Sequence, residues 1–214
     1  MLGVMPSAHA RRTYTSMLPH LDPAMLFVSA TKGIENGTLL RMTEVARQVV
    51  GERFTPRVAA LSGPTFAREV VRGEPAAVAI ASPDVELTRD IQAAFSGPSF
   101  RLYTNDDVIG VELGAALKNV IAIGAGVCHG LGLGNNTMAA LITRGLVEIT
   151  RLAVAMGGRS KTLAGLAGLG DLVLTCTGAL SRNRQVGVDL AKGRKIGEIL
   201  AAMRMVAEGV ETTT

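Results

Sequence analysis

The sequence predicts an α/β unit over residues 1–104, followed by an all-α unit over residues 105–214. The first hundred residues alternate short β-rich runs with helical stretches, which is typical of a parallel or mixed sheet with helices on its faces. After Thr104 the strand signals stop, and the rest of the chain has helical periodicity. With 214 residues, 48% of them hydrophobic, the chain can build one full domain or two small ones.

The strands and helices of the first unit follow from short runs of sequence. The opening LGVMPS is typical of an internal strand that leads into a turn and a helix. Helices are expected within residues 37–54 and 85–97, where apolar residues recur at helical spacing. Further strands are expected in LFVSATKG (26–33), RVAALSGP (57–64), AAVAIAS (76–82) and FRLYTN (100–105).

A long helix is expected directly after the last strand, with Asn105 or Asp106 as its N-cap. The apolar run from Val108 to Leu133 is long enough to suggest a membrane span. It carries Glu112, Lys118 and several glycines, however, and this favours a buried helix of a soluble protein.

Charge and composition favour a small phosphorylated ligand over nucleic acid. The net charge is +4 and the pI about 9.4, but the basic residues are scattered and only 3% of residues are aromatic. The two cysteines, Cys128 and Cys176, lie far apart and indicate neither a disulfide framework nor a zinc site, so a reducing cytoplasm is the expected location. No metal is expected, because the three histidines have no metal-ligand spacing.

The glycine-rich stretch from Gly165 to Arg184 is not a nucleotide loop. Neither G-x-G-x-x-G nor G-x-x-x-x-G-K-[ST] occurs anywhere in the chain. Its glycines instead allow close backbone approach, so that nearby polar side chains can converge on one ligand. Arg182 offers a planar fork of donors that matches phosphate, although SRNR could also be a solvated loop. The converging residues are Asp171, Thr175, Ser181, Arg182 and Asn183.

Lys118 is the main candidate for proton transfer. It shares a helix face with Val111, Ala115 and Ala122, which is expected to be buried. Burial lowers the pKa of a lysine towards neutrality and suits it to acid–base work. A structural lysine with an acidic partner is the alternative.

Two strand ends add weaker candidates. Lys32 follows a predicted strand, at the sheet edge where open α/β sheets bind ligands. In LSGPTFAREV, the backbone amides of residues 65–67 could face an anion, or the segment could be an ordinary turn.

Taken in order, six stretches resemble the NAD(P)-dependent glycerol-3-phosphate dehydrogenases of the bacterial type. The resemblance implies part of a Rossmann domain followed by a helical domain like that of 6-phosphogluconate dehydrogenase. It also implies interconversion of sn-glycerol 3-phosphate and dihydroxyacetone phosphate, which supplies glycerophospholipid synthesis. The stretches are ATKGIE (30–35), LSGPTFAREV (61–70), GVELGAALKNVIAIGAGV (110–127), GLGLGNNTMAALITRGLVEI (130–149), GLAGLGDLVLTCTGALSRNR (165–184) and VAEGV (206–210).

The resemblance also assigns roles. Lys118 matches the catalytic proton acceptor, and Lys32 a second lysine shared by substrate and cofactor. The cofactor is NAD or NADP, with NADPH favoured for the bacterial family, and a homodimer is possible. The remaining substrate positions are Gly63, Thr65, Asp171, Ser181, Arg182 and Asn183, and the remaining cofactor positions are Ala67, Arg182, Val206 and Glu208.

The chain also departs from the family pattern. The family's first strand and glycine fingerprint are missing, as are its last helices, so the chain is expected to be an inactive fragment. A sibling dehydrogenase with another substrate and a non-catalytic helical interaction module remain alternatives. Local departures fall at Gly134, Asn135, Asn136, Met138 and Leu163.

Overall fold

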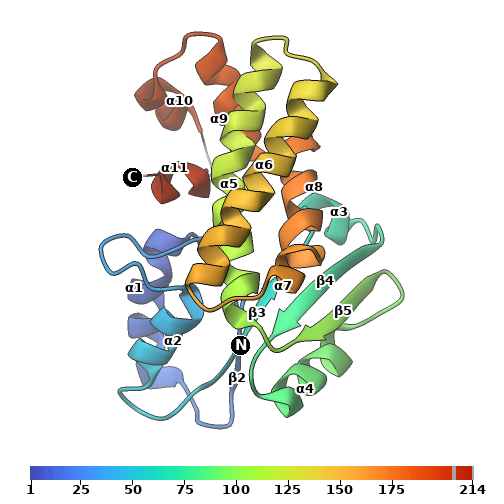
Figure 1. Ribbon diagram of the computed structural model, residues 1–214. Coiled ribbons are helices and arrows are strands. Elements are labelled where there is room, and N and C mark those ends of the chain that lie inside the picture. Colours follow the sequence, from blue (N-terminus) through green and yellow to red (C-terminus); the bar gives the residue numbers. More distant parts are fainter. Residues whose placement is uncertain (204–205, 214) are drawn as a thin grey trace.

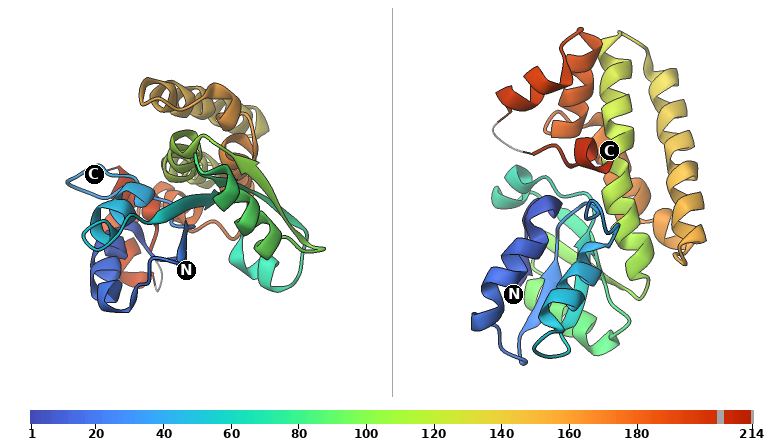
Figure 2. Two further views of the ribbon diagram at one scale, coloured as in Figure 1. Left: turned by 90° about the horizontal axis from the view of Figure 1, so that it is seen from below. Right: turned by 90° about the vertical axis from the view of Figure 1, so that its left-hand side faces the viewer.

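The computed structural model describes residues 1–203 and 206–213 and contains an α/β layer beneath a group of helices (Figure 1). The last strand ends at Asn105, and the first helix of the upper part begins at Val108. The two views of Figure 2 show that this helix, α5, rises from the sheet through the middle of the helical part.

The sheet has five strands in the order β1-β2-β3-β4-β5. Strands β1 to β3 are parallel, β4 is antiparallel to β3, and β5 is parallel to β4. The sheet is therefore mixed rather than purely parallel, because β4 and β5 run opposite to β1, β2 and β3. The strands are β1 (Leu2–Gly3), β2 (Leu26–Ser29), β3 (Arg57–Ser62), β4 (Ala76–Ala81) and β5 (Phe100–Asn105).

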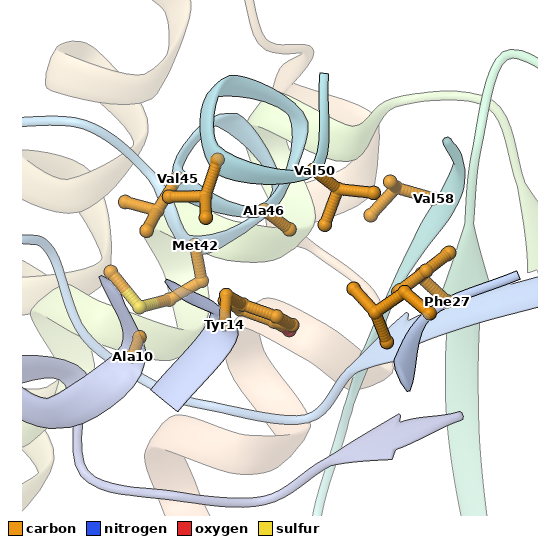
Figure 3. Close-up of a cluster of buried hydrophobic side chains, with 10 residues drawn as sticks. Ala10, Tyr14, Phe27, Met42, Val45, Ala46, Val50 and Val58 are labelled. Atoms are coloured by element: carbon orange, nitrogen blue, oxygen red, sulfur yellow. The ribbon is translucent and has the colours of Figure 1, made fainter. Parts of the chain in front are cut away.

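Alternate residues of the central strands feed opposite faces of the sheet. Phe27 and Val58 pack with Tyr14 of the first helix and with Val45 and Val50 of the second (Figure 3). Their neighbours Val28 and Ala59 belong to a second cluster that includes residues of α4. The helices of this part are α1 (Ser7–Met17), the 3₁₀ turn η1 (Leu18–His20), α2 (Met42–Val50), α3 (Ala67–Val71) and α4 (Val85–Phe95).

Helix α2 is shorter than the sequence predicts. Residues 34–41 form a closed loop instead, in which Ile34 and Arg41 make an isolated antiparallel bridge. Gly37 and Leu39 have positive φ angles of 87° and 59°, which interrupt helical geometry. Arg41 then caps α2, and the Glu44 side chain accepts a hydrogen bond from the Arg41 backbone amide at 2.9 Å.

The upper part is helical throughout, as the sequence indicates. The helix expected after β5 is capped by Asp107 rather than by Asn105 or Asp106: Asn105 ends the strand, and Asp107 accepts from the Gly110 amide at 2.8 Å. The helices are α5 (Val108–Gly130), α6 (Asn135–Ala155), α7 (Ser160–Leu163), the π-helical turn η2 (Leu166–Gly170), α8 (Asp171–Thr177), α9 (Arg182–Ala191), α10 (Ile196–Ala202) and α11 (Glu208–Thr212).

Helix α5 is the core of the upper part. It is long and apolar enough to cross a membrane by composition, yet 67% of its most apolar window is buried inside the protein, as in a core helix. Leu163, one of the positions that depart from the family pattern, is fully buried in the cluster around α5, and Met138 packs against that cluster.

Two glycines let α5 and α9 cross with their backbones in contact. A Cβ atom on Gly126 would lie 1.9 Å from the carbonyl oxygen of Arg184, and one on Gly187 would lie 1.9 Å from that of Ile123. Since real atoms do not approach so closely, side chains at these positions would push the two helices apart.

Replacing Gly126 with Ala should therefore destabilise the protein. We expect Gly126→Ala to lower the free energy of unfolding by about 1–3 kcal/mol through overpacking. Gly124→Ala is the matched control: its new methyl would meet only the Leu141 side chain at an ordinary 3.7 Å. This control should raise stability by about 0.5–1 kcal/mol through helix propensity. Urea unfolding followed by circular dichroism measures both, and equal effects would refute the close crossing.

Candidate active site

Two lysines share one buried carboxylate where the sheet meets the helices. Lys32 Nζ lies 2.7 Å from Asp171 Oδ2, and Lys118 Nζ lies 2.6 Å from Asp171 Oδ1. The side chains of Lys118 and Asp171 are 6% and 1% exposed, whereas that of Lys32 is 20% exposed. We call this group the lysine–aspartate triad. Of the three, Lys32 is the one most open to solvent.

Each triad member comes from a different part of the fold. Lys32 follows the carboxyl end of β2, as the sequence predicts, and Lys118 lies in the middle of α5. Asp171 is the first residue of α8, directly after the glycine-rich turn η2. The face of α5 that carries Lys118 is buried, as expected from its apolar neighbours. The acidic partner considered as a structural alternative is therefore present, and it holds both lysines.

Further hydrogen bonds fix the two ammonium groups. Lys32 Nζ also donates to the Gly63 carbonyl oxygen at 2.9 Å, and Thr65 Oγ1 donates to the same oxygen at 3.1 Å. Lys118 Nζ donates to Thr175 Oγ1 at 2.8 Å, and that hydroxyl donates to the Asp171 carbonyl at 2.6 Å. The end of β3 and the first turn of α8 thus complete the surroundings of the triad.

Burial and charge shift the titration of the triad. The pKa of Lys118 is lowered from 10.5 to about 8, chiefly by burial and also by the nearby Lys32 charge, while Asp171 opposes both effects. Burial alone would raise the pKa of Asp171, but the two ammonium charges hold it below its ordinary value. Lys118 can therefore exchange a proton near neutral pH, and Asp171 stays ionised.

The SRNR segment begins helix α9 and is not a solvated loop. Ser181 is the N-cap of α9, and its Oγ accepts from the Arg184 amide at 3.2 Å. Asn183 Oδ1 accepts from the Gly209 amide at 2.9 Å. Both side chains are buried and bonded within the chain. Arg182 is exposed, and it donates to the Val206 carbonyl oxygen at 2.8 Å.

Helix α11 brings the cofactor candidates towards the triad. Glu208 accepts hydrogen bonds from the backbone and hydroxyl of Ser7, at 3.0 and 2.5 Å. Gly33, next to Lys32, fits between them: a Cβ there would lie within 2.7 Å of both side chains. Gly209 packs on the Asn119 carbonyl, one residue beyond Lys118. The turn after β2 and the start of α11 are therefore in contact.

Not every candidate joins this cluster. Within the described residues, no hydrogen bond or ion pair links Arg182 or Ala67 to the triad, and Ala67 is exposed at the start of the short helix α3. Sequence reasoning overlooked Ser7 and Asn119, whose Nδ2 lies 3.4 Å from the Lys32 carbonyl oxygen. Ser7 follows the end of β1, as Lys32 follows β2, so the same strand-end rule could have found it.

Among the described residues, neither a metal-binding cluster nor a reactive thiol at Cys176 is found. No three His, Cys, Asp or Glu side chains in this part of the chain lie close enough to hold a metal ion. Burial raises the pKa of the Cys176 thiol to about 12, so this thiol stays protonated and is a poor nucleophile.

Two family models match most of the chain. Residues 1–88 match the N-terminus of NAD-dependent glycerol-3-phosphate dehydrogenase, and residues 107–214 match its C-terminus. The chain is 66% identical to a glycerol-3-phosphate dehydrogenase [NAD(P)+] of Koribacter versatilis and 57% identical to one of Acidobacterium capsulatum. Both alignments cover 100% of this chain but only 64% of the relative, so the chain spans about two thirds of their length.

Solved structures agree in fold. The glycerol-3-phosphate dehydrogenase of Coxiella burnetii is 42% identical, with a TM-score of 0.93 over 99% of this chain and 64% of that protein. A yeast glycerol-3-phosphate dehydrogenase is 29% identical, with a TM-score of 0.84 over 99% of this chain and 63% of that protein. The arrangement of sheet and helices is thus shared with these proteins.

The titration of Lys118 should appear in the stability of the protein. Its pKa is about 8 in the folded state, below the ordinary 10.5, so the folded protein releases this proton at lower pH than the unfolded chain. The free energy of unfolding that depends on Lys118 is therefore flat below pH 8 and rises between pH 8 and 10.5. We expect wild type to gain stability relative to Lys118→Met over this window, by at most about 1.4 kcal/mol per pH unit. Urea unfolding at successive pH values measures the difference, with Lys192→Met as the surface control. A difference that falls with pH would contradict the assignment.

Removing the shared carboxylate should cost far more than removing an exposed one. We expect Asp171→Asn to destabilise the protein by about 3–5 kcal/mol at pH 6, because it leaves two ammonium groups without a counter-charge. The loss should be smaller at pH 9, where Lys118 is largely neutral. Asp106→Asn, which removes an exposed ion pair with Arg159, should have little effect at either pH. Equal losses at pH 6 and pH 9 would refute the coupling to Lys118.

Proposed function

The chain belongs to the NAD-dependent glycerol-3-phosphate dehydrogenase family, and on this premise we propose that its lysine–aspartate triad serves the interconversion of sn-glycerol 3-phosphate and dihydroxyacetone phosphate. The observation that carries the proposal is the pairing of a buried and a partly exposed lysine on one carboxylate. This arrangement places the positive charge of Lys32 close to Lys118, whose ammonium group can give up a proton.

Lys118 is the proton donor and acceptor in this proposal. When the carbonyl carbon of the ketone accepts a hydride, its oxygen becomes negative, and the Lys118 ammonium gives that oxygen a proton to form the alcohol. In the oxidative direction the neutral amine takes the hydroxyl proton as the hydride leaves. A pKa of about 8 supports both directions near neutral pH. Lys32 adds positive charge beside the oxygen, and Asp171 holds both lysines.

The substrate phosphate is assigned to Arg182. Its exposed guanidinium at the start of α9 supports this role, since a planar fork of donors suits phosphate. We assign Gly63 and Thr65 to the substrate side because they share a hydrogen-bonded oxygen with Lys32. Ser181 and Asn183 act on this side by holding Arg182 in place through the cap of α9 and the bond to α11.

Only part of an NAD(P) site is supported by these residues. We assign five residues to the cofactor: Lys32, Ala67, Arg182, Val206 and Glu208. The contact of Glu208 with Ser7 beside Gly33 supports a site for the nicotinamide end of the cofactor. This end would supply the hydride when bound. The pyrophosphate end has no G-x-G-x-x-G turn among the 214 residues. We therefore propose that this chain alone neither binds NADH tightly nor turns over.

The broader setting is also proposed. NADPH is favoured over NADH, and the product glycerol 3-phosphate would enter glycerophospholipid synthesis in the cytoplasm; these points rest on the family alone. A homodimer is the proposed assembly. A hollow of about 530 Å³ along α6, lined by Leu146, Val147 and Val154 among others, supports an interface there.

Ligand-dependent stabilisation tests the substrate class without requiring turnover. We expect dihydroxyacetone phosphate to raise the melting temperature of the chain, whereas dihydroxyacetone should not, because the phosphate supplies most of the contact with Arg182. At a ligand concentration of 100 Kd the stabilisation would be about 2.7 kcal/mol. Arg182→Ala should abolish the effect. Arg194→Ala, which replaces an exposed arginine beyond the other end of α9 that is paired with Asp189, should retain it.

Two outcomes would overturn parts of this proposal. Equal stabilisation by dihydroxyacetone phosphate and dihydroxyacetone, or no stabilisation by either, would refute the proposal that the substrate is phosphorylated. Reduction of dihydroxyacetone phosphate by the purified chain at ordinary dehydrogenase rates, followed through NADH absorbance, would show that the chain is active on its own.

A further inference from the structure

A second buried carboxylate joins the two parts of the fold away from the triad. Glu112 lies in the second turn of α5 and is 6% exposed. Its Oε1 accepts from the Thr43 amide at 2.8 Å, and its Oε2 accepts from the Thr43 hydroxyl at 2.6 Å and from Arg41 at 2.8 Å. All three donors belong to the start of α2. The carboxylate therefore ties α2 to α5.

The segment that Glu112 holds is the return limb of the loop of residues 34–41, which begins two residues after Lys32. Lys32 precedes Ile34 by two residues, and Ile34 pairs with Arg41 in the isolated bridge that closes the loop. The Glu35 amide donates to the Leu40 carbonyl oxygen at 3.0 Å and strengthens the same closure. Ile34 also packs against the hydrophobic cluster around α5. The bridge thus connects Arg41 to the backbone two residues beyond Lys32.

We propose that Glu112 is a positioning residue, which fixes Lys32 relative to Lys118 by anchoring the loop of residues 34–41 on α5. Glu112 and Lys118 are six residues apart on one helix, which places them about 9 Å apart along its axis. Because this helix is continuous and buried, it acts as a rigid spacer between the loop anchor and the reacting amine. The proposal rests on the proposed function only in giving Lys118 a catalytic role.

A neutral amide cannot replace the Glu112 carboxylate in this environment. The carboxylate offers only acceptors, and it meets three donors. A glutamine would turn an NH₂ group towards either Thr43 or Arg41 and would leave the Arg41 guanidinium, 11% exposed, without its buried counter-charge. The return limb would then lose its strongest link to α5, and Lys32 would be less firmly held against Asp171.

The displacement of Lys32 expected in Glu112→Gln can be measured through the pKa of Lys118. Lys32 lowers the pKa of Lys118 by its positive charge, so a more distant Lys32 lets that pKa rise. The chain has only five lysines, which makes NMR of ¹³Cε-labelled lysine practical. Lys32→Arg and Lys118→Arg assign the two signals. The titration requires neither substrate nor cofactor, so failure of the proposed function would leave the result interpretable.

Glu112→Gln and Glu44→Gln form a matched pair. Both remove a carboxylate that contacts Arg41, but Glu44 lies on α2 itself and does not reach α5. A glutamine at position 44 can still serve the capping box. We expect Glu112→Gln to shift the Lys118 midpoint upward from about 8 and to weaken the response of the Lys32 signal to that titration. Glu44→Gln should leave both signals as in wild type.

Three results would overturn the proposal. The first is a folded Glu112→Gln protein whose Lys32 and Lys118 titrations match wild type, and the second is a Glu44→Gln protein that shifts them equally. If Glu112→Gln does not fold, Thr43→Val decides the question, because it removes one of the three hydrogen bonds and keeps the ion pair. It should shift Lys118 in the same direction by less, and an unshifted midpoint is the third such result.

Discussion

The carboxylate of Asp171 is the constraint on which the arrangement of this protein depends. A lysine as deeply buried as Lys118 is unfavourable without a counter-charge, and here one carboxylate serves two ammonium groups. Because each of the three groups comes from a separate element, the pairing requires the end of β2, the middle of α5 and the start of α8 to meet at one point. Burial, aided by the Lys32 charge, keeps the pKa of Lys118 low, and the excess of one positive charge leaves the site attractive to an anion.

Helix α5 makes this meeting possible because small residues line its contacts. Its N-terminal half packs on alanines of β3 and β4 through Val108 and Val111. Gly114 allows the backbone of η2 to approach, since a Cβ there would lie 2.7 Å from the Ala167 carbonyl oxygen. The chain has 25 glycines and few aromatic residues, and this composition allows packing by close backbone contact rather than by large rings.

Features set by local pattern could be predicted from the sequence, and features set by distant contacts could not. Lys118 lies on a buried face because its helical neighbours are apolar, and Lys32 follows a strand because the β-rich run ends there. The position of each lysine could therefore be predicted from the sequence. Residues 37–41 of the loop were predicted as helix, because closure of the loop depends on a bridge that no local pattern indicates. The same holds for the choice of Asp107 as N-cap, which depends on where β5 ends. The ligand contacts predicted for Ser181 and Asn183 stay a prediction, and no local pattern indicated the hydrogen bonds that their side-chain oxygens accept from the backbone of α9 and α11.

The hydrogen bonds between Ser7 and Glu208 join residues that are 201 positions apart in the sequence. During synthesis on the ribosome, the contact beside Gly33 cannot form until α11 has left the exit tunnel, long after α1 and the strands have emerged. Until then the amide and hydroxyl of Ser7 lack their Glu208 acceptor. Formation of this contact is a late, long-range event, of the kind that slows folding in proteins with high contact order.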